Sequence, residues 1–213
     1  MESVIRSIFG STHGTQKVAQ GDTSGNICSV SGQVIVQDDA TVESIVSISG
    51  SIRVGSNCKI GAIKSASGSV KINDSSHIGK IEIASGSLSI AQQCQVESIA
   101  VLSGSTKIDK NSQIKESLIC SSGTLRLMPN VTVDGNIQTD SGNIIIEENA
   151  SLGGDITFTE MPKPKLGFFR ANYSKPKLII ASGSRLEGNI HLYRKVDVTL
   201  PPEISPNKII RHY

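Results

Sequence analysis

Aromatic side chains are almost absent from this chain of 213 residues, which has no Trp, four Phe and three Tyr. Because stable folds usually anchor their cores on a few large aromatic rings, this interior must be filled by many small aliphatic side chains. The chain is instead rich in 32 Ser, 29 Ile and 20 Gly. This composition argues against a helical bundle, and the abundant Ile with 19% charged residues argues against disorder. We therefore predict an all-β chain that forms one elongated domain.

Other absences limit the partners and the location. The formal net charge is only +2, so no basic field indicates nucleic acid, and no nucleic-acid partner is expected. No run approaches the ~20 apolar residues of a membrane-spanning helix, and residues 1–10 lack the apolar stretch of a signal peptide. The default interpretation is a cytoplasmic protein. The four Cys form no C-x-x-C pair, which predicts buried free thiols in a reducing compartment.

A repeat organises most of the sequence. The dipeptide Ser-Gly recurs every 18 residues from Ser31 to Ser103, and then at spacings of 19 residues at Ser122 and Ser141. Segments aligned on this dipeptide form columns of aliphatic residues. The column three positions after each Ser contains Val34, Ile52, Val70, Leu88, Thr106, Leu125 and Ile144. The column two positions further on contains Val36, Val54, Ile72, Ile90, Ile108, Leu127 and Ile146.

Further columns follow in each segment, and the last of them contains Ile45, Ile63, Ile81, Ile99, Leu118, Ile137 and Ile156. One holds small residues, namely Ala40, Cys58, Ser76, Cys94, Ser112, Val131 and Ala150. The next holds aliphatic residues, namely Val42, Ile60, Ile78, Val96, Ile114, Val133 and Leu152. Within a segment the apolar residues alternate with polar ones, which predicts strands that bury one face. A segment of 18 residues has room for about three short strands, and it cannot bury its own apolar face alone.

Stacking equivalent strands of successive segments buries these faces. At a spacing of about 4.8 Å, each backbone pairs with the next coil and the apolar faces fuse into one core. Glycine at the corner supplies a backbone dihedral that a Cβ atom would forbid. We therefore predict a single-stranded β-solenoid, a β-helix of roughly triangular cross-section, with about nine coils and a length of roughly 40 Å.

The chain divides into four parts. Residues 1–30 form an N-terminal segment and a weak first coil, and residues 31–158 form the regular coils. Residues 159–177 interrupt the repeat as a basic, aromatic loop. Residues 178–213 form the final coils and a C-terminal cap, in which prolines are expected to blunt the edge of the last strand.

Two of these parts are candidate contact sites. The apolar residues near the N-terminus have helical spacing, which predicts a short amphipathic helix that either caps the first coil or contacts a partner or membrane. The loop combines three of the seven aromatic residues with five basic ones, which suits an anionic surface such as membrane headgroups, or single-stranded nucleic acid. It is also compatible with a loop packed on the solenoid flank. The residues predicted to make such contacts are Ile5, Ile8, Phe9, Phe168, Phe169, Arg170 and Tyr173.

Recognisable catalytic chemistry is missing from the sequence. It contains no nucleophile elbow, Walker loop or H-E-x-x-H motif, and no column collects acidic or basic residues. His77 is the only histidine within the regular coils, and the alternation places it outward. We therefore predict that the chain is not an enzyme, with no catalytic residue, metal or cofactor.

Two other classes of protein remain as alternatives. An exported β-solenoid that binds a surface, a carbohydrate or ice would need flat outward rows of Thr or aromatic residues, whereas the outward rows here contain corner serines such as Ser51 and Ser69. A protein like the hexapeptide-repeat acyltransferases is less favoured, because Lys64 and Glu82 are charged where that family has small residues.

Three phrases occur at equivalent positions of different coils. They are Val133-Asp134-Gly135-Asn136-Ile137, Leu152-Gly153-Gly154-Asp155-Ile156 and Leu186-Glu187-Gly188-Asn189-Ile190. Together with the coil length, the aliphatic columns and the glycine corners, they make the chain resemble the bactofilins, the bacterial polymer-forming cytoskeletal proteins. The resemblance covers roughly residues 31–192.

This resemblance implies a right-handed triangular β-helix that needs no cofactor and assembles end to end into non-polar filaments. It also implies a location at the inner surface of the membrane. The expected function is a non-enzymatic structural scaffold. Its expected partners are further copies of itself, together with a membrane surface or other scaffold proteins.

Overall fold

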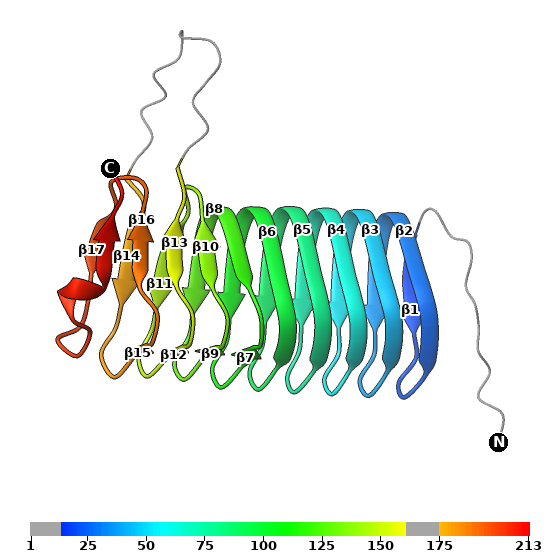
Figure 1. Cartoon of the computed structure of the whole chain (residues 1–213). Helices are drawn as coiled ribbons and strands as arrows, with labels where there is room; N and C mark the ends of the chain where they lie inside the picture. Colours follow the sequence, from blue (N-terminus) through cyan, green and yellow to red (C-terminus); the bar gives the residue numbers. More distant parts are fainter. Residues whose placement is uncertain (1–13, 161–174) are drawn as a thin grey trace, which may run out of the picture.

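The computed structural model describes residues 14–160 and 175–213, which form a rod of stacked coils (Figure 1). Strands of successive coils pair in parallel, as between β2 and β3 and between β3 and β4. The structure is a β-solenoid of about ten turns, which confirms the predicted all-β class and architecture. The repeat resumes after residue 174, because Ile144 of β11 pairs with Leu178 of β14.

Five long strands form the regular half of the rod, and each bends around two corners. They are β2 (Thr23–Val36), β3 (Thr41–Val54), β4 (Lys59–Ile72), β5 (His77–Ile90) and β6 (Gln95–Ile108). In the coil of β3, residues 41–43 lie on what we name the first face, residues 45–48 on the second face and residues 51–54 on the third face. Equivalent residues of every coil lie on the same face, because the register is constant from β2 to β6.

The later coils use shorter strands, because the spacing of 19 residues adds one residue at the first corner. Two residues separate Val96 from Ile99, and β6 continues through both. Three residues separate Ile114 from Leu118, and here the strand is interrupted between β7 and β8. The remaining elements are β1 (Gln16–Val18), β7 (Gln113–Ile114), β8 (Leu118–Leu127), β9 (Thr132–Val133), β10 (Ile137–Thr139), β11 (Asn143–Ile146), β12 (Ser151–Leu152), β13 (Ile156–Phe158), β14 (Lys177–Ile180), β15 (Arg185–Leu186), β16 (Ile190–Leu192), β17 (Asp197–Thr199), the 3₁₀-helix η1 (Pro206–Lys208) and β18 (Ile209–Arg211).

The predicted columns form the core, and no member of them is more than 3% exposed. The core also contains one aromatic ring, Phe158, which is fully buried. Its neighbours in the ladder are Thr139 and Leu192. A large ring therefore sits next to the small Thr139 side chain, and this keeps the interior filled.

The serines of the small-residue column make hydrogen bonds to backbone groups of the neighbouring turn and coil. Ser76 Oγ accepts a hydrogen bond from the Cys58 backbone N–H (3.1 Å) and donates one to the Gly55 carbonyl (3.0 Å). Ser112 makes the equivalent bonds with Cys94 and Ala91. These two hydroxyls satisfy buried backbone groups, which explains how a polar side chain is accommodated in this column.

The corner glycines form a ladder along the rod. From Gly32 to Gly123, their φ angles lie between 106° and 138°, a region that L-residues with side chains rarely adopt. A Cβ at any of these positions would also lie only 1.7–2.2 Å from the carbonyl oxygen of the glycine one coil earlier. Gly142 departs from the ladder, since its N–H donates to Thr139 Oγ1 (2.8 Å). The predicted role of the corner glycine is thus confirmed through Gly123.

The turn between the third and first faces contains one left-handed residue in each coil before the last. Besides glycine, this position holds Asp39, Asn57, Ser75, Gln93, Asn111, Asn130 and Asn149, with φ between 57° and 63°. Asn and Asp tolerate this conformation better than other L-residues, and Gly tolerates it best. The turn residues are therefore selected by backbone conformation.

We expect Gln93→Gly to raise the free energy of unfolding by about 0.5–1 kcal/mol, because Gln93 is exposed and adopts φ 60°. Urea denaturation followed by circular dichroism measures the change. Asn111→Gly at the equivalent turn is the control and should change stability less. A loss of stability in Gln93→Gly would contradict the conformational explanation.

Candidate functional site

The seven residues predicted from the sequence to contact a membrane or partner all lie outside the described residues. They are Ile5, Ile8, Phe9, Phe168, Phe169, Arg170 and Tyr173. Their role stays a prediction. The features of the described surface that can take part in contacts include a groove on the first face and the two ends of the rod.

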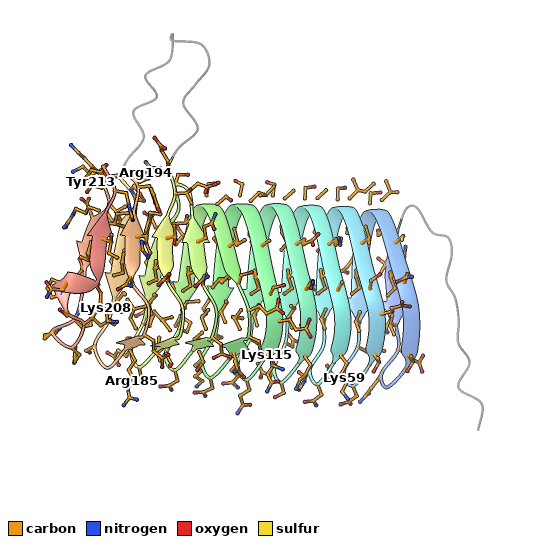
Figure 2. The ribbon with its side chains drawn as sticks, in the orientation of Figure 1. Lys59, Lys115, Arg185, Arg194, Lys208 and Tyr213 are labelled. Carbon is orange, nitrogen blue, oxygen red and sulfur yellow. The ribbon has the colours of Figure 1, made fainter. Side chains whose placement is uncertain are left out.

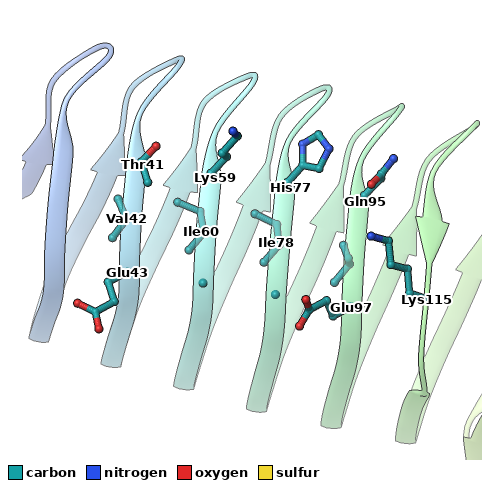
Figure 3. Close-up of a pocket in the computed structure, with 13 residues that line it drawn as sticks. Thr41, Val42, Glu43, Lys59, Ile60, His77, Ile78, Gln95, Glu97 and Lys115 are labelled. Atoms are coloured by element: carbon teal, nitrogen blue, oxygen red, sulfur yellow. The ribbon is translucent and has the colours of Figure 1, made fainter.

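The groove crosses β3 to β6 on the first face and has a volume of about 620 Å³. Figure 3 shows Lys59, His77 and Gln95 projecting in a row from successive strands. Glu43 of β3 and Glu97 of β6 lie further along their strands, at the two ends of the groove. The outward position of His77 agrees with the prediction from the alternation.

Glycine forms the floor of this groove for a reason of backbone packing. A Cβ at Gly61 would lie 2.4 Å from the Glu43 carbonyl oxygen, and one at Gly79 would lie 2.1 Å from the Gly61 carbonyl oxygen. The open space between Glu43 and Glu97 therefore follows from the close approach of successive coils. Side chains of both signs surround it, so the groove suits polar contacts on an exposed surface.

The described residues contain no group of three or more His, Cys, Asp or Glu side chains that is arranged to hold a metal ion. The adjacent acidic pair of Asp38 and Asp39 has a structural role in a turn. Asp38 Oδ1 accepts a hydrogen bond from the Ser56 N–H (2.8 Å), and Asp39 occupies the left-handed position.

The C-terminal end presents free strand edges on two of the three faces. Among the described residues, β17 pairs only with β14 and β18 pairs only with β16. Val198 and Ile209 are half-buried, whereas their ladder partners Leu178 and Ile190 are 0% exposed. An apolar surface and unpaired backbone groups therefore lie together at this end.

The first face of the same end is covered. Here η1 and the preceding turn contain Pro201, Pro202 and Pro206, so the prolines lie outside β17 and β18 and do not blunt the edges of those strands. Lys208, shown on the last coil in Figure 2, donates from Nζ to the carbonyls of Glu187 (2.8 Å) and Gly188 (3.0 Å). The predicted C-terminal cap thus closes one face and leaves two open.

Stacked rings attach the last strand to the rod. The His212 ring stacks on Tyr193 with a centroid distance of 4.1 Å, and its Nε2 lies 3.1 Å from His191 Nδ1. The His212 backbone N–H also donates to the Leu192 carbonyl (2.9 Å). The sequence contains no signal for this cluster, because Tyr193 directly follows β16 and His212 directly follows β18, and these two strands pair only in the folded chain.

The N-terminal end differs, because polar residues occupy its interior positions. Gln16 takes the ladder position of Val34, and Ser24 takes that of Val42. Gln16 Nε2 donates to the Cys28 carbonyl (2.6 Å) across the end of the rod. The β1 strand pairs with residues 34–36 of β2, and the Gly14 N–H donates to the Ser31 carbonyl (3.2 Å). Among the described residues, no strand pairs with residues 23–30 of β2 on this side.

Three of the four thiols are buried, as predicted, but the prediction is wrong for Cys28, which is exposed. Cys28 pairs with Val46 in a column that points outward from the second face. Burial raises the pKa of the Cys120 thiol to about 11, and burial also raises the pKa values of Cys58 and Cys94. A raised pKa keeps these thiols protonated at neutral pH.

We expect a native-state maleimide titration at pH 7.5 to modify one thiol of the four quickly, namely Cys28, because only the thiolate attacks and the other three are buried. Unfolding in guanidinium chloride should expose all four. Cys28→Ser should leave no fast-reacting thiol in the native chain. Rapid reaction of Cys120 in that variant would contradict the burial.

Comparisons of the chain with family models, with curated proteins and with solved structures give no match. Among the described residues, no helix is long and apolar enough to span a membrane.

Proposed function

We propose that this protein is a non-enzymatic structural scaffold, a β-solenoid that joins other copies end to end into filaments, as its resemblance to the bactofilins implies. The observation that carries the proposal is the C-terminal end, where two strand edges and half-buried aliphatic side chains are exposed together. Unpaired strand edges are templates for pairing with another chain.

A second copy both pairs with the free strand edges of this end and covers its exposed aliphatic side chains. Its strands supply hydrogen-bond partners for the free edges of β17 and β18. Its own Val198 and Ile209 cover the same side chains of the first copy, which extends the core across the junction. The junction adds backbone hydrogen bonds between strands and apolar burial, the same two contributions that stabilise the stacked coils of the rod.

A filament also needs a contact at the other end. The edge of β2 over residues 23–30, with which no described strand pairs on this side, supplies it. Polar interior residues such as Gln16 and Ser24 make this end less apolar than the C-terminal end. The two junctions therefore differ in strength, and the C-terminal junction is the stronger.

Negative-stain electron microscopy of the purified full chain tests the proposal. We expect filaments that persist in 1 M salt, because strand pairing and apolar burial are little screened by ions. A strictly monomeric protein at tens of micromolar would contradict the proposal and favour the alternative of an exported binding or adhesive solenoid.

A further inference from the structure

An apolar strip runs along the second face of the rod over the coils of β2 to β6. We define this strip by its outward side chains, which are Val30, Val46, Ile48, Ala66, Ala84, Ala100 and Leu102. Ile48 and Leu102 are 55% and 59% exposed. Val30 and Val46 also belong to the large hydrophobic residues that are exposed in the described chain.

The strip is specific to this face. In the same coils, the first face carries the outward side chains of Lys59, His77 and Gln95, and the third face carries those of Arg53 and Lys71. Scattered apolar residues on a surface need no explanation, but a contiguous patch indicates an interaction site.

The strip has a defined shape. Ala66 and Ala84 leave a shallow groove of about 450 Å³ between the larger Ile48 and Leu102. One ion pair crosses the strip, between Lys64 Nζ and Glu82 Oε2 at 2.9 Å, and both side chains are about half exposed. Four successive coils therefore present, in order, the large apolar Ile48, the small Ala66 beside the cation of Lys64, the small Ala84 beside the anion of Glu82, and the large apolar Leu102.

We propose that the apolar strip binds the same strip of a second copy, with the two rods side by side and antiparallel. A two-fold axis between the coils of Lys64 and Glu82 places Ile48 of each copy opposite Leu102 of the other. The same axis places Lys64 opposite Glu82. An isologous interface requires a surface that is complementary to itself in this way.

The charges select this arrangement from the alternatives. A parallel alignment of two rods places Lys64 opposite Lys64, and an antiparallel alignment shifted by one coil places like charges opposite each other at the axis. Juxtaposed like charges disfavour both arrangements. The apolar residues supply the affinity and the ion pairs supply the register.

This lateral contact is separate from the end-to-end contact, since it uses the flank of coils that lie far from β17 and β18 (Figure 1). The strip spans five coils, or about 20 Å, which is small for a stable interface. A single contact is therefore weak, and filaments that repeat it gain strength from multivalency.

Sedimentation velocity of charge-reversed full-length chains tests the pairing. We expect Lys64→Glu and Glu82→Lys each to weaken dimerisation at least tenfold, because each places like charges across the axis. An equimolar mixture of the two variants should restore dimers, because every charge then faces its opposite. Rescue in the mixture cannot come from repair of the ion pair within one chain.

Two controls separate the contact from changes in the fold. Lys59→Glu makes the same charge change on the first face and should leave the dimer unchanged. Leu102→Ser should abolish the side-by-side contact between rods while the circular dichroism spectrum stays that of the wild type. A wild-type chain that is monomeric at 100 µM, or a mixture that stays monomeric, would overturn the proposal.

Electron microscopy distinguishes this proposal from the proposed function. If both are right, Leu102→Ser filaments keep their length but lose lateral pairing. Paired filaments in Leu102→Ser would overturn the lateral contact and leave the end-to-end contact intact.

Discussion

Gly86→Ala should destabilise the rod by at least about 4 kcal/mol and lower the melting temperature by about 10 °C or more. The new Cβ would lie 1.8 Å from the Gly68 carbonyl oxygen and 2.9 Å from its carbonyl carbon. Gly86 also adopts φ 138°, where a side chain adds strain. The two coils would have to separate, and separation breaks the ladder of hydrogen bonds on both sides of the corner.

Gly25→Ala is the matched control, because it adds the same methyl group to a strand of the same solenoid. The nearest atom to its Cβ is Glu43 Oε2 at 3.9 Å, which is ordinary van der Waals contact. We expect a change within about 1 kcal/mol. Thermal unfolding followed by circular dichroism compares the two variants, and equal melting temperatures would show that the glycine ladder is not needed.

Arg211→Pro should shorten the filaments to dimers. The His212 N–H donates inward to Leu192 of β16, and N–H groups alternate in direction along a strand, so the Arg211 N–H faces the free edge of β18. Proline removes this donor and blocks strand addition at the edge. The junction at the other end would still join two copies, which is why dimers are the expected limit.

Arg211→Ala separates the loss of the backbone donor from the loss of the charged side chain. It keeps the N–H, and we expect filaments of wild-type length. Light scattering and negative-stain microscopy measure the length of each variant. Full-length Arg211→Pro filaments would show that β18 does not form the junction.

The sequence predicted the interior of the rod well, because the signal for it repeats in every coil. Val34, Ile52 and Val70 occupy one column whose spacing alone determines that they stack, and all three are buried. The corner glycine and the outward position of His77 followed from the same periodicity. The resumption of the register at Leu178 was visible for the same reason.

The surfaces were less predictable, because each occurs once and depends on contacts between different coils. The covering of the first face by Lys208 depends on carbonyls some 20 residues earlier. Cys28 is exposed because it points outward from the second face. The Ser-Gly alignment alone does not show this direction, because it does not give the positions of the corners. The prolines of the last coil were expected to blunt a strand, but they lie in the turn and 3₁₀-helix between β17 and β18.

The apolar strip shows a further limit of column patterns. Ile48 and Leu102 are aliphatic residues at outward positions, and by type alone they would be assigned to the core. Only the bend of each long strand around two corners shows which aliphatic residues point outward. A surface of this kind is found from the structure.

Cryo-electron microscopy of the assembled full chain tests the central claim, end-to-end assembly, most directly. About ten turns at 4.8 Å give a rod of roughly 48 Å, so we predict an axial repeat near twice that length, because copies joined through their C-terminal ends alternate in direction. The 4.8 Å spacing of the strands should continue across each junction. Filaments without this axial repeat, or single rods with free ends at every concentration, would contradict the scaffold.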